Sequence, residues 1–146
     1  MNIIVLSGGL SPERDVSLSS GSLIANALID NGHNVYLLDL LTGSDKKYEE
    51  LKFLNKHGQD RYSFTVPSEE PDLVSLKKQY PDLIGKNVID ICKKADIVFI
   101  ALHGSIGENG QLQSLFDLNS VTYTGSSYIG CMLAMDKDIS KKAAKL

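Results

Sequence analysis

The sequence has few residues of the kinds that build metal centres or membrane spans. It contains two cysteines, Cys92 and Cys131, whose spacing matches no metal-ligand motif. Cys92 falls on the apolar face of an expected helix, which predicts a buried, reduced thiol. No segment reaches the roughly 20 apolar residues of a membrane helix. The first apolar run, residues 3–6, follows no basic residue and is too short for a signal peptide. These absences predict a cytoplasmic protein without a membrane partner.

Positive charge is also scarce. The 146 residues include 15 lysines and arginines against 18 acidic residues, which gives a net charge of −3. This balance provides no attraction to the phosphates of nucleic acids, so no nucleic-acid partner is expected. The loop at Gly8 and Gly9 matches neither the dinucleotide-binding pattern G-x-G-x-x-G nor the P-loop pattern G-x-x-x-x-G-K-[ST]. The two common nucleotide-binding signatures are therefore missing.

The apolar runs of the chain predict a single α/β domain over residues 1–146. Three runs are typical of buried strands, at residues 2–7, 34–40 and 97–102, and helical patterns separate them. Strands that alternate with helices favour a Rossmann-like, open and mainly parallel sheet with helices on both faces. The first helix is expected to bury one stripe, formed by Val16, Ser20, Leu23, Ile24, Ala27 and Leu28.

The middle of the chain, residues 41–95, gives weaker signals. The alternating apolar residues of segment 61–66 are compatible with a strand, and three prolines between 67 and 81 interrupt any longer element. We interpret 41–95 as a variable surface insertion. A further short strand is expected at residues 121–123, close to the third apolar run.

The C-terminal residues 134–146 predict the start of a helix with an unfinished apolar stripe. Ile139, Ala143 and Leu146 follow helical spacing up to the last residue. No glycine, proline or polar cap closes this helix. We therefore expect a fragment of a longer protein, in which this stripe packs against a missing domain.

Three polar loops follow the predicted strands, at residues 7–17, 103–110 and 124–127. In an open α/β sheet, ligands bind at the carboxyl ends of the strands, and glycines let the backbone approach them closely. Glu13 in the first loop can hold a substrate ammonium group, or can be a solvated charge favoured by the helix dipole. His103 in the second loop can donate to an anion, orient Glu13, or be a structural histidine tied to a backbone carbonyl.

Other charged and titratable residues have plainer interpretations. Arg14 can pair with Glu13 or Asp15, and such an exposed ion pair would stabilise the fold little. His33 lies in a turn and His57 in a polar segment, so both are interpreted as surface residues.

Three longer motifs resemble those of one family, the D-alanine–D-alanine ligases. Residues 7–21, Ser-Gly-Gly-Leu-Ser-Pro-Glu-Arg-Asp-Val-Ser-Leu-Ser-Ser-Gly, resemble its opening motif. Residues 102–113, in which Leu-His-Gly precedes Gly-Glu-Asn-Gly and a glutamine, resemble the second motif. Residues 123–137, with Tyr-Thr-Gly-Ser and then Ala-Met-Asp-Lys, resemble the third. The order and spacing match, and the resemblance covers residues 1–40 and 96–146.

The resemblance implies the first, pre-ATP-grasp domain of a three-domain enzyme of peptidoglycan synthesis. In the family's reaction, ATP activates the carboxylate of one D-alanine, and the amine of a second D-alanine attacks the acyl phosphate. ATP and Mg²⁺ are the implied cofactors of the full-length enzyme. Lys137 matches a lysine that contacts the nucleotide phosphates, and no metal ligand is expected in this chain. The implied partners are D-alanine, the remaining ATP-grasp domains of the same polypeptide, and a second copy in a homodimer.

The motif alignment also implies roles for individual residues. Glu13 matches the acid that holds the ammonium group of the first D-alanine, and His103 matches a histidine of the same subsite. The resemblance assigns both to the catalytic site. Val16 matches an apolar residue beside the substrate methyl group, and Ser17 and Gly104 belong to the same expected substrate-binding set.

Two alternatives remain open at this level. A D-alanine–D-serine or D-alanine–D-lactate ligase would differ mainly in its second subsite, which this segment does not contain. A non-catalytic α/β binding module would have kept the fold and lost the chemistry. In all cases the isolated chain is expected to lack ligase activity, because the nucleotide and metal ligands are missing.

Overall fold

A computed structural model describes residues 1–145 and contains a parallel sheet of three strands. The strands are β1 (Asn2–Ser7), β2 (Asn34–Asp39) and β3 (Ile97–Ile100), in the order β2-β1-β3. Both neighbours pair with β1 in the parallel sense. The predicted open, parallel α/β architecture is therefore confirmed, and β3 ends two residues before the expected position 102.

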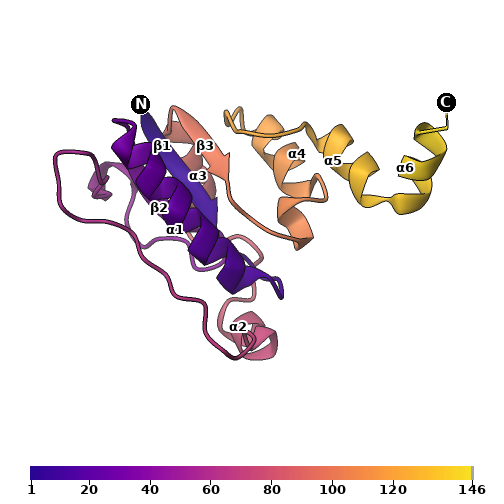
Figure 1. The fold of residues 1–146 in the computed structure, drawn as a ribbon, viewed down its shortest axis with the longest axis horizontal. Coiled ribbons are helices and arrows are strands. Elements are labelled where there is room, and N and C mark those ends of the chain that lie inside the picture. The colour runs from indigo at the N-terminus through magenta and orange to yellow at the C-terminus, as the bar shows by residue number, and fades with distance from the viewer. Residues whose placement is uncertain (146) are drawn as a thin grey trace.

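Helices cover both faces of this sheet (Figure 1). Helix α1 (Arg14–Asp30) lies on one face, where Ala25 and Ile29 pack with Ile3 and Val5 of β1. Helices α3 (Val88–Lys94) and α4 (Gln111–Leu118) lie on the other face, in a second apolar cluster. That cluster joins the alternate residues of β1 to the two helices, and its members include Ile4, Leu6, Val88, Ile91 and Phe116. Because β1 is buried on both sides, its sequence is a continuous apolar run.

The buried face of α1 differs from the predicted stripe. Val16 and Leu23 are 51% and 69% exposed, whereas Ile24 and Leu28 are partly buried against the cluster, so the predicted apolar stripe is only partly correct. The residues that α1 buries are mostly small or polar, namely Arg14, Ser17, Gly21, Ser22, Ala25 and Ile29. A Cβ on Gly21 would lie 2.7 Å from the Cβ of Ser7, so the helix and β1 approach too closely for a larger side chain. This close packing favours small residues over the apolar ones that the periodicity favoured.

Segment 41–87 is mostly irregular, and the strand expected at 61–66 does not form. Tyr62 is held instead by the side chain of Asn26 on α1, which donates to its carbonyl at 2.8 Å and accepts from its amide at 3.0 Å. The Tyr62 hydroxyl donates to the carbonyl of Val35, and burial raises the pKa of this phenol to about 12. These bonds replace the ladder that a strand would make. The proline-containing stretch holds one short helix, α2 (Leu73–Gln79). Residues 88–94 lie within the expected surface insertion, yet they form α3 and bury Val88, Ile91 and Cys92 in the core.

Cys92 confirms the expectation of a buried free thiol. It lies on α3 within the apolar cluster, and burial raises its pKa to about 12. A thiol with such a pKa is almost entirely protonated at neutral pH and is a poor nucleophile. Cys131 is a second free thiol and is only partly buried.

The short strand expected at 121–123 is reduced to a single parallel bridge between Tyr123 and Val98 of β3. The amide of Val98 donates to the carbonyl of Thr122, and the amide of Thr124 donates to the carbonyl of Val98. This segment therefore extends the sheet beside β3, and it carries the loop 124–127 to the same edge as the other loops.

The C-terminal segment forms two helices that point away from the sheet (Figure 1). They are α5 (Tyr128–Met135) and α6 (Lys137–Ala143), and neither contains a buried residue. The predicted continuous helix over 134–146 is broken at Asp136, whose carboxylate accepts from the amides of Asp138 and Ile139 and caps α6. Ile139 is 43% exposed, and Leu146 lies outside the described residues. Of the described helices, none combines the length and apolarity needed to cross a membrane.

The contact between α1 and β1 predicts an unusual effect of helix-favouring mutations. Alanine normally stabilises a helix interior by about 1 kcal/mol relative to glycine. We expect Gly21→Ala to lower the free energy of unfolding by about 1–3 kcal/mol, because the new methyl group would overlap with Ser7. Urea denaturation followed by circular dichroism measures this change.

Gly130→Ala is the matched control. Gly130 lies within α5, where a new Cβ would stand 3.4 Å from the Cβ of Ser126, an ordinary contact. This variant should be at least as stable as the parent chain. If Gly21→Ala were as stable as Gly130→Ala, the close approach of α1 to β1 would be contradicted.

Candidate functional site

The loops after β1 and β3 meet at the carboxyl edge of the sheet. Both strands run in the same direction, so both loops leave the sheet at this edge. The hydroxyl group of Ser11 donates to the carbonyl of His103 at 2.9 Å and joins the two loops directly. Convergence of these loops was expected from topology, and the structure shows the bond that fixes it.

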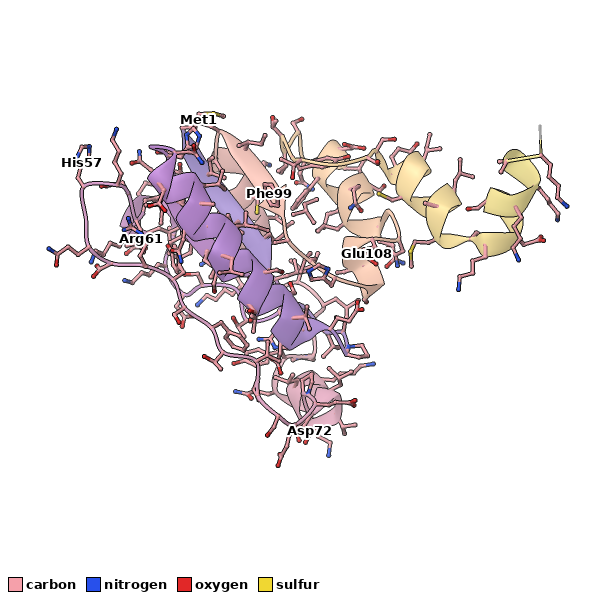
Figure 2. The ribbon with its side chains drawn as sticks, in the orientation of Figure 1. Met1, His57, Arg61, Asp72, Phe99 and Glu108 are labelled. Atoms are coloured by element: carbon pink, nitrogen blue, oxygen red, sulfur yellow. The ribbon has the colours of Figure 1, made fainter. Side chains whose placement is uncertain are left out.

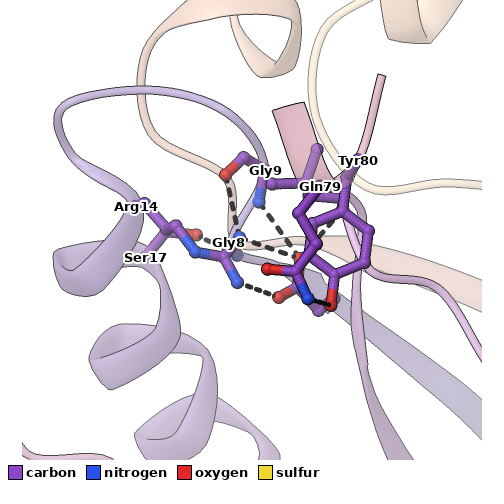
Figure 3. A network of polar contacts seen from close by, with 8 residues as sticks. Gly8, Gly9, Arg14, Ser17, Gln79 and Tyr80 are labelled. Atoms are coloured by element: carbon purple, nitrogen blue, oxygen red, sulfur yellow. Dashed lines mark hydrogen bonds and ion pairs between the residues drawn. The ribbon is translucent and has the colours of Figure 1, made fainter. Parts of the chain in front are cut away.

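A buried ion pair fixes the first loop from the side of β2. The guanidinium of Arg14 binds both carboxylate oxygens of Asp39, the last residue of β2, and its Nη1 also donates to the carbonyl of Gly9 at 2.9 Å. Figure 3 shows the Arg14 side chain reaching from the start of α1 to Gly9. The side chains of Arg14 and Asp39 are 10% and 16% exposed. The pair therefore joins β2, the first loop and α1.

Asp39 also accepts hydrogen bonds from backbone amides. Its Oδ1 accepts from the amide of Leu41 at 2.8 Å and from that of Gly9 at 3.3 Å. A Cβ on Gly8 would lie 2.5 Å from this oxygen, and Gly8 has a φ of +74°, so only glycine suits this position. The loop therefore wraps closely around the carboxylate.

Sequence reasoning missed this pair. It assigned Arg14 to exposed acidic neighbours, whereas the arginine is 8% exposed and contacts a residue 25 positions away. One signal was present in the sequence: Asp39 lies near the end of a predicted parallel strand, at the edge where the glycine-rich loop also lies. A carboxylate at that position can satisfy a cation from the neighbouring loop.

Glu13 is the N-cap residue of α1, and its side chain does not cap the helix. Its Oε2 lies 2.9 Å from the position that a Cβ on Gly104 would occupy, and Gly104 has a φ of +66°. The carboxylate therefore lies directly against the second loop. Within residues 1–145, no donor of the chain forms a hydrogen bond with this exposed carboxylate. Its acceptor capacity is thus available at the edge of the sheet.

His103 is half-buried, and its ring faces α1. Its Nε2 lies 3.0 Å from the hydroxyl oxygen of Ser20, and its carbonyl accepts from Ser11. Within the described chain the ring makes no hydrogen bond with Glu13, so the hypothesis that His103 orients this acid finds no contact here. The two residues instead lie on adjoining parts of one edge, because Glu13 contacts Gly104, the residue after His103.

Ser17 and Val16 point in different directions from the start of α1. Ser17 is fully buried: its hydroxyl donates to the carbonyl of Ala101 at 2.7 Å and accepts from the amide of Gly8 at 2.9 Å. It ties α1 to the end of β3. The side chain of Val16 is half-exposed and lies three residues after Glu13. Val16 therefore has a solvent-accessible side chain that a ligand can contact, whereas Ser17 does not.

The second and third loops line an open cleft of about 350 Å³. Its lining includes Glu108, Gln113, Thr124 and Ser126. The side-chain amide of Gln113 donates to the carbonyl of Gly107 at 2.7 Å. Glu108 lies in the loop before α4, well away from His57, which lies at the tip of a peripheral loop (Figure 2).

Lys137 lies apart from this edge. It is the first residue of α6, which projects away from the sheet, and it is exposed. The structure therefore does not bring Lys137 together with Glu13 and His103. In the described part of the chain, no three His, Cys, Asp or Glu side chains gather in a group that could hold a metal ion. Residues 1–145 alone do not fit a magnesium or nucleotide site.

Comparisons with known proteins agree with the motifs. A family model described as the D-ala D-ala ligase N-terminus matches residues 2–126. A D-alanine–D-alanine ligase from Pediococcus pentosaceus is 45% identical over 148 residues, which cover 97% of this chain and 42% of that protein. The ligase from Lacticaseibacillus casei is 40% identical, with 97% and 41% covered. The chain thus spans well under half the length of these relatives.

Solved structures show the same fold. The crystal structure of D-alanine–D-alanine ligase from Bacillus anthracis matches 99% of this chain and 34% of its own, with a TM-score of 0.63 and 24% identity. The structure of that ligase complexed with ATP gives a TM-score of 0.59. Together with the match over residues 2–126, the likeness confirms the resemblance, and the chain belongs to the D-alanine–D-alanine ligase N-terminal domain family.

Proposed function

We propose that this chain is the N-terminal domain of an ATP-dependent D-alanine–D-alanine ligase and supplies the subsite for the first D-alanine. The observation that carries the proposal is the contact of Glu13 with the loop at Gly104, on the edge of the sheet where ligands of such folds bind. Curated relatives with up to 45% identity bear the name of this ligase, which supports the same activity.

The chemistry of the edge suits an amino acid. A carboxylate without an internal donor can accept charge-assisted hydrogen bonds from an ammonium group, and these are stronger than bonds between neutral groups. Glu13 then binds the ammonium group of D-alanine, and Val16 offers an apolar surface for its methyl group. Gly104 leaves room beside the carboxylate, since any side chain there would meet Glu13. His103, positioned by Ser20, presents its imidazole to the same subsite.

ATP and magnesium belong to the proposed full-length enzyme. Their chemistry is the activation of the substrate carboxylate as an acyl phosphate. The described residues fit neither group by themselves, so we assign this chain only one contact, from the Lys137 ammonium group to the nucleotide phosphates. Lys137 begins a helix on the projecting segment, where further parts of a longer ligase can approach it.

The same segment supports the proposed partners. Ile129, Met132, Leu133 and Met135 on α5 are 43–55% exposed, which leaves apolar surface uncovered. We assign this surface to the ATP-grasp domains of the same polypeptide, since the curated relatives are more than twice as long as this chain. We further propose that the full-length enzyme is a homodimer, lies in the cytoplasm and acts in peptidoglycan synthesis.

The purified 146-residue chain should fold without catalysing the ligase reaction. The apolar clusters on both faces of the sheet provide a core, whereas the groups that position ATP are missing. Circular dichroism with thermal melting tests the folding. Phosphate release in the presence of ATP, Mg²⁺ and D-alanine tests the activity, and turnover above background would contradict the proposal, because this chain would then hold a complete site.

In the full-length ligase that carries this sequence, Glu13→Gln should weaken use of the first D-alanine. The substitution keeps the shape and removes the charge that binds the ammonium group. We expect the KM for the first D-alanine to rise about 10- to 100-fold, the range for losing a hydrogen bond between charged groups. The KM for ATP should change less than about twofold, since no nucleotide contact is altered.

Asp15→Asn provides the matched control. Asp15 lies in the same first turn of α1, so its substitution removes the same charge from the same helix end. Its KM for the first D-alanine should stay within about twofold of the parent value, because helix-dipole effects alone are small. Equal effects of Asp15→Asn and Glu13→Gln would show that general electrostatics, and not a specific ammonium contact, is responsible.

A further inference from the structure

We infer that Arg14 is a positioning residue for substrate binding: through its ion pair with Asp39 and its bond to Gly9, it holds Glu13 in place against the Gly104 loop. The inference deepens the proposed function and rests on it, because it requires Glu13 to bind the first D-alanine. It concerns a residue that touches no substrate and acts through its neighbour in the chain.

The backbone on both sides of Glu13 is fixed. The amide of Arg14 donates to the carbonyl of Ser11 at 3.1 Å, and the carbonyl of Glu13 accepts from the amide of Ser17 at 2.9 Å. Ser11 and Ser17 are in turn bonded to the chain around β3, at His103 and Ala101. Glu13 is therefore held between two points anchored to the second loop, and only its side chain can rotate.

Arg14 attaches the first loop to the end of β2. Its Nη1 binds both the carbonyl of Gly9 and Asp39 Oδ1, and its Nη2 binds Asp39 Oδ2. The planar guanidinium makes these contacts at once, whereas a lysine ammonium is a single point charge and cannot reproduce the fork. Loss of the guanidinium contacts would remove the bond to the Gly9 carbonyl and leave Gly9 with only the longer bond from its amide to Asp39, which loosens the loop that leads into Glu13. The backbone around Glu13 would then be held mainly from the side of β3, through Ser11 and Ser17, and its position against the Gly104 loop would be less well defined.

Arg61, in the irregular segment, forms a more exposed ion pair with the last residue of α1 and serves as a comparison. Its Nη2 binds Asp30 at the far end of α1, and its Nη1 binds the carbonyls of Gly58 and Asp60. The side chains of Arg61 and Asp30 are 37% and 65% exposed, against 10% and 16% for Arg14 and Asp39. Arg61 therefore has the same kinds of partners as Arg14, and it lies at the opposite end of α1 from Glu13.

The test compares Arg14→Lys with Arg61→Lys in the full-length ligase. Both substitutions keep the positive charge and replace the planar guanidinium, with its several hydrogen bonds, by a single ammonium group. Arg14→Lys should raise the KM for the first D-alanine about tenfold or more, since small misplacements of a binding group are costly. Its KM for ATP should stay within about twofold, and Arg61→Lys should leave both constants within about twofold.

A double variant separates positioning from general stabilisation. If Arg14 acts through Glu13, then Glu13→Gln combined with Arg14→Lys should raise the KM for the first D-alanine no further than Glu13→Gln alone. Multiplying effects would overturn the inference and assign Arg14 a purely structural role. An Arg14→Lys variant indistinguishable from Arg61→Lys would overturn it too.

The same series distinguishes this inference from the proposed function. An unchanged KM in Glu13→Gln would reject the proposed subsite itself, and the inference would be rejected with it. A raised KM in Glu13→Gln together with an unchanged KM in Arg14→Lys would reject the inference alone. Thermal melting of all variants, with the isolated chain as reference, shows that each one is folded at the assay temperature.

Discussion

The ion pair between Arg14 and Asp39 joins β2, the first loop and α1 at the candidate site. Burying two charges is costly, and their attraction offsets this cost only when their remaining hydrogen-bonding capacity is also used. Here the carboxylate accepts from two backbone amides as well as from the guanidinium, and the guanidinium donates to the Gly9 carbonyl. Removing one partner would leave the other charge buried, at a cost of about 3–5 kcal/mol. The pair therefore specifies one conformation of the first loop.

The geometry of the edge follows from that conformation. Gly8 has a left-handed backbone and no side chain because Asp39 occupies the space beside it. The Gly8 amide then reaches Ser17, and Ser17 reaches the end of β3. Glu13 emerges between these anchors and meets the second loop. In physical terms, three polar residues of the opening motif, Ser11, Arg14 and Ser17, hold the loop in shape.

The local sequence pattern was sufficient to predict the strands and the edge of the sheet where the candidate site lies. Continuous apolar runs predicted β1 and β2 almost to the residue, because these strands are buried on both faces. The rule for open α/β sheets then predicted that the loops with Glu13 and His103 converge. The contacts within the site were not predictable in this way: the bond from His103 to Ser20 and the Arg14–Asp39 pair join residues 83 and 25 positions apart.

Two of the three missed elements share one cause, which is that tertiary contacts overrode local pattern. Helix α1 buries Gly21 against Ser7 as well as Ala25 and Ile29, and it leaves Val16 and Leu23 exposed. Segment 61–66 has the alternation of a strand, yet Asn26 takes the backbone groups of Tyr62 that a ladder would need. The helix predicted from 134 onwards breaks at Asp136 because its carboxylate caps the following turn. The first two outcomes depend on neighbours that a short sequence window does not contain, whereas the cap at Asp136 is a local contact.

A double-mutant cycle on Arg14 and Asp39 tests most directly whether this pair holds the edge together. Free energies of unfolding would be measured for Arg14→Ala, Asp39→Ala and the double variant, alongside the same cycle for Arg61 and Asp30. We expect a coupling energy of about 2 kcal/mol or more for the buried pair, against less than about 1 kcal/mol for the exposed one. Equal couplings in the two cycles would contradict the account, because the first loop would then not depend on this ion pair.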